Sequence, residues 1–290
     1  MWRWTLSCCL LLLAACSNPF YRPTQQQYPN LAQFQLNQQR LWLPSGSGNR
    51  LHGELLCPEQ GRAGLVVHFH GNHGNLSGTA DKVAWLCDYG YRVLVFDYSG
   101  YGLSSGSPSF EALHQDALAV MDHALELQDG QPGRLVLFGT SLGGAVLLDA
   151  LADFPGRGGV DLVVIDSSFT SYKQIAVDVM YSYPLGFLLT WMPALLLPNH
   201  YAPFGDLQRL AGVPVLVSHC SGDRLIDIRH ARKLADNLPG PARFLDLGDC
   251  PHARGYMDGR NENRQRLLAV MAAWPEAVTA AALSPPGTAR

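Results

Sequence analysis

The sequence has few charged residues, few cysteines for its length and no excess of basic side chains. Only 16% of its 290 residues are charged, and 21 lysines and arginines stand against 24 aspartates and glutamates. With 47% hydrophobic residues the chain can bury a large core, which excludes an intrinsically disordered protein. The net charge of −3 excludes a basic nucleic-acid module, and seven cysteines are too few for a small disulfide-held scaffold. One sizeable globular domain remains.

The N-terminal apolar run is too short to span a bilayer. Arg3 is the only charge in residues 1–7, and residues 8–15 are apolar apart from two cysteines, which is the pattern of a signal peptide. Leu13-Ala14-Ala15-Cys16 resembles the bacterial lipobox, in which the chain is cut before a cysteine that is then lipidated. We therefore predict a signal peptide over residues 1–15 and lipidation at Cys16. An ordinary secretory signal with a chance cysteine is the alternative.

Ser17 follows the predicted lipidation site, as in lipoproteins sorted to the outer membrane. More than one acyl chain makes such an anchor stable, so we expect a lipid-anchored protein of the bacterial cell envelope, facing the periplasm. Loss of Arg3 with the signal peptide leaves 20 basic against 24 acidic residues, a net charge of −4. This acidic balance does not suggest nucleic acid or another anionic polymer as a partner. The membrane is an expected partner, because the predicted lipid on Cys16 would insert into it. The sequence leaves the oligomeric state open.

The mature chain divides into three parts. Residues 16–38 are rich in Gln, Asn, Pro and Tyr without periodicity, which predicts a tether. Residues 39–275 form the predicted domain, which opens with a hairpin of strands 39–43 and 50–56 around a loop of turn formers. Residues 276–290 are the predicted C-terminal tail.

Within the domain, short apolar strands alternate with amphipathic helices. This pattern predicts an α/β fold with a mostly parallel sheet covered by helices on both faces. Ligands of such sheets bind beyond the carboxyl ends of the strands. The expected strands are 65–70, 93–97, 135–138, 162–166, 213–218 and 244–247, and the expected helices are 79–89, 109–127, 141–154, 228–237 and 261–274.

Ser141 lies in a turn that is typical of a catalytic nucleophile. Gly139-Thr140-Ser141-Leu142-Gly143 is a G-x-S-x-G pattern between a predicted strand and a predicted helix, the context of the nucleophile elbow. Glycines flank the serine because the sharp turn leaves no room for side chains and imposes unusual dihedral angles. The alternative, a serine that only caps a helix, does not need these glycines. We predict Ser141 as the nucleophile.

A serine hydroxyl needs a base that accepts its proton and a carboxylate that orients the base. In this fold the acid and then the histidine follow the serine along the chain. Asp223 follows the strand 213–218, and His252 follows the strand 244–247. We predict Asp223 as the acid and His252 as the base.

Other histidines and carboxylates compete for these roles. His219 follows the same strand as Asp223 but precedes it, so we expect it behind the acid rather than at the reacting atoms. Three further histidines fall on predicted helices, where a solvated surface position is expected: His114, His123 and His230. The alternative acids near strand ends are Asp166, Asp227, Asp246 and Asp249.

An oxyanion hole needs two backbone amides beside the nucleophile. The amide of Leu142, which follows Ser141, is the first candidate. The second candidate is the amide of Asn72 in the glycine-containing loop His70-Gly71-Asn72-His73-Gly74-Asn75.

The sequence resembles the alpha/beta-hydrolase superfamily of serine hydrolases over roughly residues 40–275. The motifs that carry the resemblance are the loop 70–75, Tyr98-Ser99-Gly100-Tyr101-Gly102-Leu103-Ser104 and the elbow at Ser141. The resemblance implies a serine that is acylated by an ester or thioester, after which water releases the acid, with no cofactor. The pattern after Asp223 lacks the proline common in relatives, and His252 lies in Cys-Pro-His instead of Gly-x-Gly-His.

An apolar insertion at about residues 169–201 lies where this superfamily inserts a cap over the active site. The segment 181–198 contains prolines at 184, 193 and 198, which argue against a membrane-spanning helix. An apolar cap favours an apolar acyl or alkyl group, and hence a small ester or lipid-like substrate; the alternative is a helix pair that only packs.

Four cysteines remain once the signal peptide and Cys16 are set aside: Cys57, Cys87, Cys220 and Cys250. They allow three pairings, and a disulfide-permitting compartment leaves the choice open. Cys220 and Cys250 each precede a candidate catalytic residue, so a bridge between them would join two active-site loops.

Two other functions are compatible with parts of the sequence. His68-Phe69-His70-Gly71-Asn72-His73 imitates the His-x-His-x-Asp-His run of zinc hydrolases, but Asn72 replaces the aspartate and no convincing downstream ligands follow, so we expect no metal. A non-catalytic envelope lipoprotein with a hydrolase fold is the second alternative, because a triad does not prove turnover.

Overall fold

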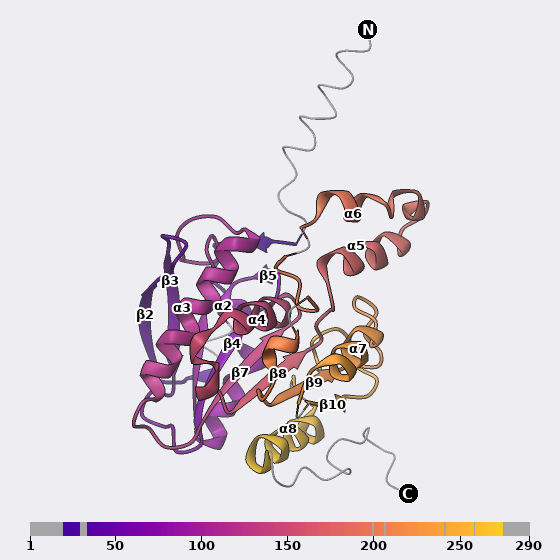
Figure 1. The fold of residues 1–290 in the computed structure, drawn as a ribbon. Coiled ribbons are helices and arrows are strands. Elements are labelled where there is room, and N and C mark those ends of the chain that lie inside the picture. The colour runs from indigo at the N-terminus through magenta and orange to yellow at the C-terminus, as the bar shows by residue number, and fades with distance from the viewer. Residues whose placement is uncertain are drawn as a thin grey trace, which may run out of the picture.

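An eight-stranded sheet, in the order β10-β9-β8-β7-β4-β6-β3-β2, forms the centre of the computed structural model (Figure 1). The structure describes residues 20–274 except 30–33, 199, 206, 241 and 258. All neighbouring strands are parallel except β3, which is antiparallel to both β2 and β6. The strands are β2 (Gln38–Pro44), β3 (Arg50–Leu56), β4 (Gly64–Phe69), β6 (Tyr91–Phe96), β7 (Arg134–Thr140), β8 (Leu162–Asp166), β9 (Val215–His219) and β10 (Ala242–Asp246). The predicted α/β fold is therefore confirmed, and each predicted strand overlaps an observed one.

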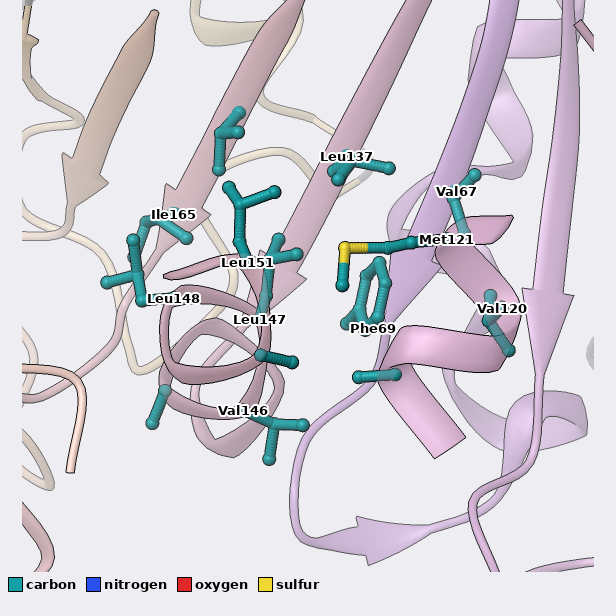
Figure 2. Packing of buried hydrophobic residues seen from close by; sticks show 14 of the residues in the cluster. Val67, Phe69, Val120, Met121, Leu137, Val146, Leu147, Leu148, Leu151 and Ile165 are labelled. Atoms are coloured by element: carbon teal, nitrogen blue, oxygen red, sulfur yellow. The ribbon is translucent and has the colours of Figure 1, made fainter. Parts of the chain in front are cut away.

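The sheet is buried on both faces because its strands are apolar on both. In β7, Leu135 and Leu137 belong to one core, and Val136 and Phe138 belong to the other. The first core lies under α3 (Phe110–Gln128) and α4 (Leu142–Asp153). Figure 2 shows α4 packing its leucines against this face beside Met121 and Phe69. The layering leaves the carboxyl ends of the parallel strands as the edge on which chemistry can be placed.

The second face is covered by α8 (Asn261–Ala273) and a run of short helical turns. The single helix predicted over 79–89 is wrong: the chain forms α2 (Leu76–Thr79) and two 3-10 turns, η2 (Ala80–Lys82) and η3 (Ala84–Tyr89). The indole of Trp85 donates to the Lys82 carbonyl at 2.9 Å, the acceptor that a continued α-helix would need for the amide of Leu86. That amide bonds Val83 instead.

The other predicted helices are present, with each end within one residue of its predicted position. They are α3, α4, α8 and α7 (Arg229–Asn237), which packs on β9 and β10. Two further 3-10 turns connect elements at the surface, η4 (Pro155–Gly159) and η6 (Leu207–Leu210).

Part of the predicted tether packs on the domain. Residues 20–28, which we call the strap, contain β1 (Arg22–Pro23), which pairs in parallel with β5 (His73–Gly74). The side-chain amide of Asn75 donates to the carbonyls of Thr24 and Gln26, at 2.9 and 2.8 Å. Tyr21 is buried in the core. The prediction of a tether is wrong for residues 20–28. This segment is held by one buried aromatic side chain, Tyr21, and by backbone hydrogen bonds, and neither produces a side-chain periodicity in a glutamine-rich sequence.

The predicted cap forms a separate small layer at the upper right of Figure 1. It consists of α5 (Tyr172–Tyr181), the turn η5 (Gly186–Leu189) and α6 (Met192–Leu196). Within the residues that the structure describes, no helix has the length and apolar character needed to cross a membrane. The predicted signal peptide, Cys16 and the predicted C-terminal tail at 276–290 lie outside the described residues.

Candidate active site

Ser141 stands at the junction of β7 and α4 with a backbone that L-residues rarely adopt. Its φ is 55° and its ψ is −117°, and its amide donates to the Asp166 carbonyl at 2.8 Å. A Cβ on Gly143 would lie 1.9 Å from the carbonyl oxygen of Phe69, so α4 can approach β4 only with glycine there. The structure thus has the strained strand–turn–helix geometry that the sequence pattern predicts.

Ser141, His252 and Asp223 form one hydrogen-bonded line. The hydroxyl Oγ of Ser141 lies 3.0 Å from Nε2 of His252, and Nδ1 of His252 lies 2.7 Å from Oδ2 of Asp223. The three residues follow three different strands, β7, β10 and β9, and meet at the carboxyl edge of the sheet. Residues 82 and 111 positions away from Ser141 in sequence are therefore brought together by the parallel topology.

Asp223 is held by more donors than His252 alone. Its oxygen Oδ1 accepts from the amides of Leu225 and Ile226, at 2.9 and 3.0 Å, and Nε2 of His219 lies 3.2 Å from Oδ2. Burial alone raises the pKa of Asp223, but the hydrogen bonds from His219 and His252 outweigh it and hold that pKa well below its usual range. The carboxylate is therefore charged and fixed in direction at neutral pH.

His219 is itself completely buried. Its Nε2 also lies 2.8 Å from the carbonyl oxygen of Ile226, so this nitrogen carries the proton that it shares between two acceptors. Although burial lowers it, the bond to Asp223 keeps the pKa of His219 above the ordinary value. The position agrees with the expectation that His219 lies behind the acid, on the side away from Ser141.

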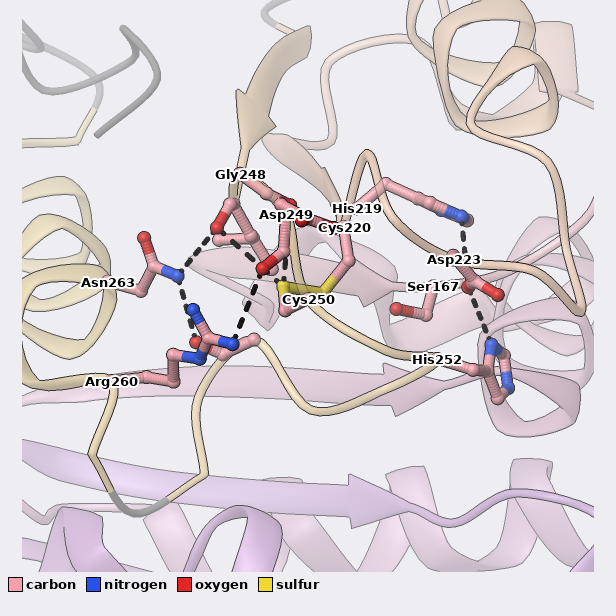
Figure 3. Close-up of a disulfide and its surroundings, with 12 residues drawn as sticks. Ser167, His219, Cys220, Asp223, Gly248, Asp249, Cys250, His252, Arg260 and Asn263 are labelled. Atoms are coloured by element: carbon pink, nitrogen blue, oxygen red, sulfur yellow. Dashed lines mark hydrogen bonds and ion pairs between the residues drawn. A yellow bond between two sulfur atoms is a disulfide. The ribbon is translucent and has the colours of Figure 1, made fainter. Parts of the chain in front are cut away.

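A disulfide joins the two loops that carry Asp223 and His252 (Figure 3). The sequence left three pairings open, and the structure has Cys220 bonded to Cys250 and Cys57 bonded to Cys87. The amide of Ser221 donates to the Gly248 carbonyl at 2.8 Å beside the bridge. The loop after β10 thus cannot move far from the loop after β9, and the Asp223–His252 distance is constrained covalently.

Two further contacts hold the His252 loop from other elements. Nζ of Lys82 donates to the Ala253 carbonyl at 2.8 Å, and the hydroxyl of Ser167 accepts from the Ala253 amide at 3.2 Å. Neither residue was identified from the sequence. A lysine in an apolar turn and a serine directly after a strand were the available signals.

The loop 70–75 lies against Ser141. A Cβ on Gly71 would be 3.6 Å from the Cβ of Ser141, and the next residue, Asn72, is half-buried. The carbonyl of Asn72 accepts from the Arg22 amide of the strap at 2.9 Å and from the Tyr101 hydroxyl at 3.0 Å. Two donors therefore fix the Asn72 carbonyl. On the other side of Ser141, Leu142 begins α4, and first-turn amides have no partner within their helix.

The competing acids are engaged elsewhere. Oδ1 of Asp166 accepts from the hydroxyls of Ser167 and Ser218, at 3.3 and 3.2 Å, and burial raises the pKa of Asp166. Asp227 pairs with Arg229 at the surface. Asp246 accepts from the Gly248 amide at 2.9 Å within the loop after β10, and Asp249 lies in the same loop (Figure 3).

The surface positions expected for His114 and His230 are wrong, because each is buried against a carboxylate. Nδ1 of His114 lies 2.7 Å from Asp149 of α4, and Nε2 of His230 lies 2.8 Å from Asp178 of α5. A helix-face pattern shows that a histidine is on a helix but not which neighbour covers it. His123 is partly exposed beside Glu126.

Two of the three histidines in the zinc-like run, His68 and His70, bond to protein groups. Nε2 of His68 lies 3.1 Å from the Thr140 hydroxyl, and Nδ1 of His70 donates to the Gly71 carbonyl at 2.8 Å. The ring of His70 packs against those of Tyr98 and Tyr101, at 4.6 and 5.1 Å between centroids. Among the described residues no three His, Cys, Asp or Glu side chains are grouped so as to hold a metal ion.

Comparison with solved structures shows the same fold. An esterase from Pyrococcus furiosus superposes with a TM-score of 0.69 over 89% of this chain and 99% of its own, at 15% identity. The esterase EaEST from Exiguobacterium antarcticum gives a TM-score of 0.61 over 81% of this chain and 100% of its own, at 16% identity. At 15 and 16% identity, these comparisons establish a shared fold only.

Sequence comparison shows the family. The uncharacterized protein YfhR of Escherichia coli is 32% identical over 218 residues, which are 73% of this chain and 72% of YfhR. An uncharacterized protein of Mycobacterium tuberculosis is 31% identical over the same shares of both chains. Residues 60–210, which include the loop 70–75 and the elbow at Ser141, match the family described as "Serine aminopeptidase, S33". With this match, the fold and the relatives, the chain belongs to the S33 serine aminopeptidase family of alpha/beta hydrolases.

Proposed function

We propose that this hydrolase cleaves carboxylic ester or thioester bonds of an apolar acyl substrate through an acyl-enzyme intermediate, and that it is anchored to the bacterial envelope through a lipidated Cys16. The observation that carries the proposal is the line from the Ser141 hydroxyl through His252 to Asp223, with distances of 3.0 and 2.7 Å. Both distances lie within hydrogen-bond reach.

The proposed chemistry follows from the hydrogen-bond directions. Nδ1–H of His252 donates to the Asp223 carboxylate, which leaves Nε2 free to accept the Ser141 proton as Oγ attacks the acyl carbon. His252 then returns that proton to the leaving alkoxide or thiolate, and the acyl group remains on Ser141. In the second half of the reaction His252 takes a proton from water, the hydroxide attacks the acyl carbon, and the acid leaves as Ser141 regains its proton.

The proposed oxyanion hole consists of the backbone amides of Leu142 and Asn72. Each tetrahedral intermediate carries a negative oxygen, and prearranged amides stabilise it without reorganisation. The position of Leu142 at the start of α4 and the fixed carbonyl of Asn72 support this assignment. No cofactor enters this mechanism.

The substrate class rests on the cap. The cap begins just after Ser168, whose hydroxyl donates to the Ser141 carbonyl at 2.8 Å, and its surface is strongly apolar. The acyl or alkyl chain of a bound substrate that extends from the active site toward the cap would therefore contact apolar side chains. The esterase titles of the structural neighbours agree with an ester substrate.

A covalent label tests the nucleophile. A fluorophosphonate probe should label the wild-type protein and the exposed-serine control Ser107→Ala, but not Ser141→Ala. On p-nitrophenyl esters of increasing chain length, Ser141→Ala should lose several orders of magnitude in kcat, with a residual rate from the oxyanion hole. Unchanged hydrolysis by Ser141→Ala would remove Ser141 from the mechanism. Absence of both labelling and turnover would favour the non-catalytic lipoprotein.

A separate experiment tests the anchor. Cells fed an alkyne analogue of palmitate should incorporate it into the wild-type chain but not into Cys16→Ser, and a larger share of the wild type than of Cys16→Ser should fractionate with the outer membrane. Equal incorporation, or equal release of both proteins into the soluble periplasmic fraction, would leave an ordinary secretory signal.

A further inference from the structure

The large hydrophobic side chains that are exposed gather on the cap. Among the described residues thirteen such side chains are exposed, and nine of them fall between residues 181 and 196. Exposed fractions there reach 74% at Leu195 and 61% at Trp191. The nine residues, which we call the cap surface, are Tyr181, Tyr183, Leu185, Phe187, Leu188, Leu189, Trp191, Leu195 and Leu196.

The composition of the cap surface matches a bilayer interface better than it matches water. Residues 181–198 contain no Lys, Arg, Asp or Glu, and the two tyrosines and one tryptophan accompany leucines and a phenylalanine. Trp and Tyr are enriched where protein meets lipid headgroups, because one end of each ring system is polar. The cap also contains an apolar pocket of about 450 Å³, which the side chains of Met180, Tyr183 and Leu188 help to line.

The strap brings the beginning of the described chain to the base of the cap. The ring of Phe20 lies 5.1 Å from that of Tyr172, the first residue of α5. Only Ser17, Asn18 and Pro19 separate Phe20 from the predicted lipidation site at Cys16. Four chain steps of about 3.6 Å span about 14 Å at most. Acyl chains on Cys16 would therefore enter the bilayer within about 14 Å of a side chain that contacts α5.

We propose that the cap surface docks onto the lipid bilayer and turns the active site toward it. The inference rests on the proposed function through the anchor at Cys16, because the short reach from Cys16 to Phe20 makes the bilayer the surface that covers the cap. The anchor and the cap surface then form a two-part attachment in which the acyl chains hold the molecule at the membrane and the cap orients it. The substrate enters from the lipid side, as an acyl ester of the membrane itself.

Vesicle binding by an unanchored protein tests the cap surface separately from the anchor and from catalysis. The mature chain, residues 16–290 carrying Cys16→Ser, lacks the apolar segment 1–15 with Trp2 and Trp4, and it is mixed with phosphatidylethanolamine–phosphatidylglycerol vesicles and sedimented. Leu188→Ser with Leu195→Ser, added to Cys16→Ser, should weaken binding at least tenfold. The matched control, Trp42→Ser with Tyr89→Ser in the same background, removes two exposed rings remote from the cap and should bind as well as Cys16→Ser alone.

Tryptophan fluorescence reports which part of the protein meets lipid. Brominated acyl chains in the vesicles should quench the emission of Cys16→Ser, and Trp191→Phe should abolish that quenching while vesicle binding persists. Circular dichroism spectra that match the parent protein would show that the leucine variants fold.

Three outcomes would overturn the proposal: no vesicle binding by Cys16→Ser, equal binding by the leucine variant, or quenching that persists in Trp191→Phe. A dimer of Cys16→Ser in solution that the leucine variant converts to monomer, without vesicle binding, would assign the cap surface to a second copy of the chain. Because hydrolysis is not measured, a failed serine mechanism leaves this result unaffected.

Discussion

His219 contacts the same carboxylate oxygen of Asp223 that bonds His252. Nε2 of His219 lies 3.2 Å from Oδ2 of Asp223, and Nδ1 of His252 lies 2.7 Å from it. The same carboxylate oxygen therefore accepts hydrogen bonds from two histidines, the buried His219 and His252, which faces Ser141. We therefore expect His219 to act as a positioning residue, which sets the strength of the Asp223–His252 bond without touching substrate.

Replacement of His219 should change the pH dependence of hydrolysis. In His219→Ala, Oδ2 of Asp223 keeps its bond to His252 and loses the one to His219, and the stronger remaining bond should move the acidic limb of the kcat/KM profile to higher pH. Loss of the positioning bond should lower kcat about tenfold, equivalent to about 1.4 kcal/mol. His219→Gln keeps an N–H donor and should recover part of that loss. A profile of unchanged shape, measured on a p-nitrophenyl ester, would assign His219 to packing only.

Tyr101 should affect kcat more than KM. Its hydroxyl donates to the Asn72 carbonyl at 3.0 Å, and Tyr101→Phe leaves the Arg22 amide as the remaining partner observed there. Loss of about 1 kcal/mol from the positioning of the proposed oxyanion amide predicts a roughly fivefold lower kcat with KM nearly constant. Tyr89→Phe, at an exposed ring at the end of η3, is the control and should match the wild type. A lower melting temperature with an unchanged kcat would contradict the positioning role.

The two disulfides offer a matched pair, because each joins cysteines 30 residues apart. Chain entropy predicts a similar loss of stability, about 3–4 kcal/mol, for Cys220→Ala with Cys250→Ala and for Cys57→Ala with Cys87→Ala. Only the first pair frees the loops of Asp223 and His252, so only that variant should lose kcat beyond its loss of stability. Denaturant unfolding and ester hydrolysis at 15 °C measure the two effects. Equal kcat in both double variants would show that the hydrogen bonds hold the loops without the bridge.

His114 should stabilise the fold mainly at acidic pH. The hydrogen bond to Asp149 outweighs burial and raises the pKa of His114 above its ordinary value, so the protonated form is favoured when folded. A raised folded pKa stabilises fully below the unfolded value of about 6.5, and this contribution is lost as the pH rises through the folded value. His114→Gln should therefore melt at a lower temperature than the wild type, with the largest difference at pH 5.5 and the smallest at pH 9. Each kcal/mol lost from the free energy of unfolding should lower the melting temperature by about 2–4 °C. For Asp149→Asn, the difference in melting temperature from the wild type should likewise become smaller as the pH rises. A difference that does not vary with pH would refute the stabilising role of the His114–Asp149 pair.

Much of the fold and the candidate site could be predicted from local sequence. Apolar strands alternating with helices encode a parallel sheet, because a strand buried on both faces must be apolar on both. Gly139, Ser141 and Gly143 encode the elbow, because few other residues fit its backbone. Chain order and loop position were sufficient to select Asp223 and His252, which lie in line with Ser141.

Tertiary structure decided what depends on partners far apart in the chain. The glutamine-rich strap is held by the backbone of residues 72–74 and by the side chains of Asn75 and Ser77, and backbone pairing leaves no mark in side-chain periodicity. His114 and His230 are buried because α4 and α5 bring carboxylates to them. The sequence by itself determined the elbow at Ser141, the chain order of Ser141, Asp223 and His252, and an apolar segment at 181–198. Only packing decided that His219 shares Asp223, that the strap holds the loop at Asn72, and that the chain reaches the base of the cap at Phe20, since each is a contact between segments whose meeting no local pattern specifies.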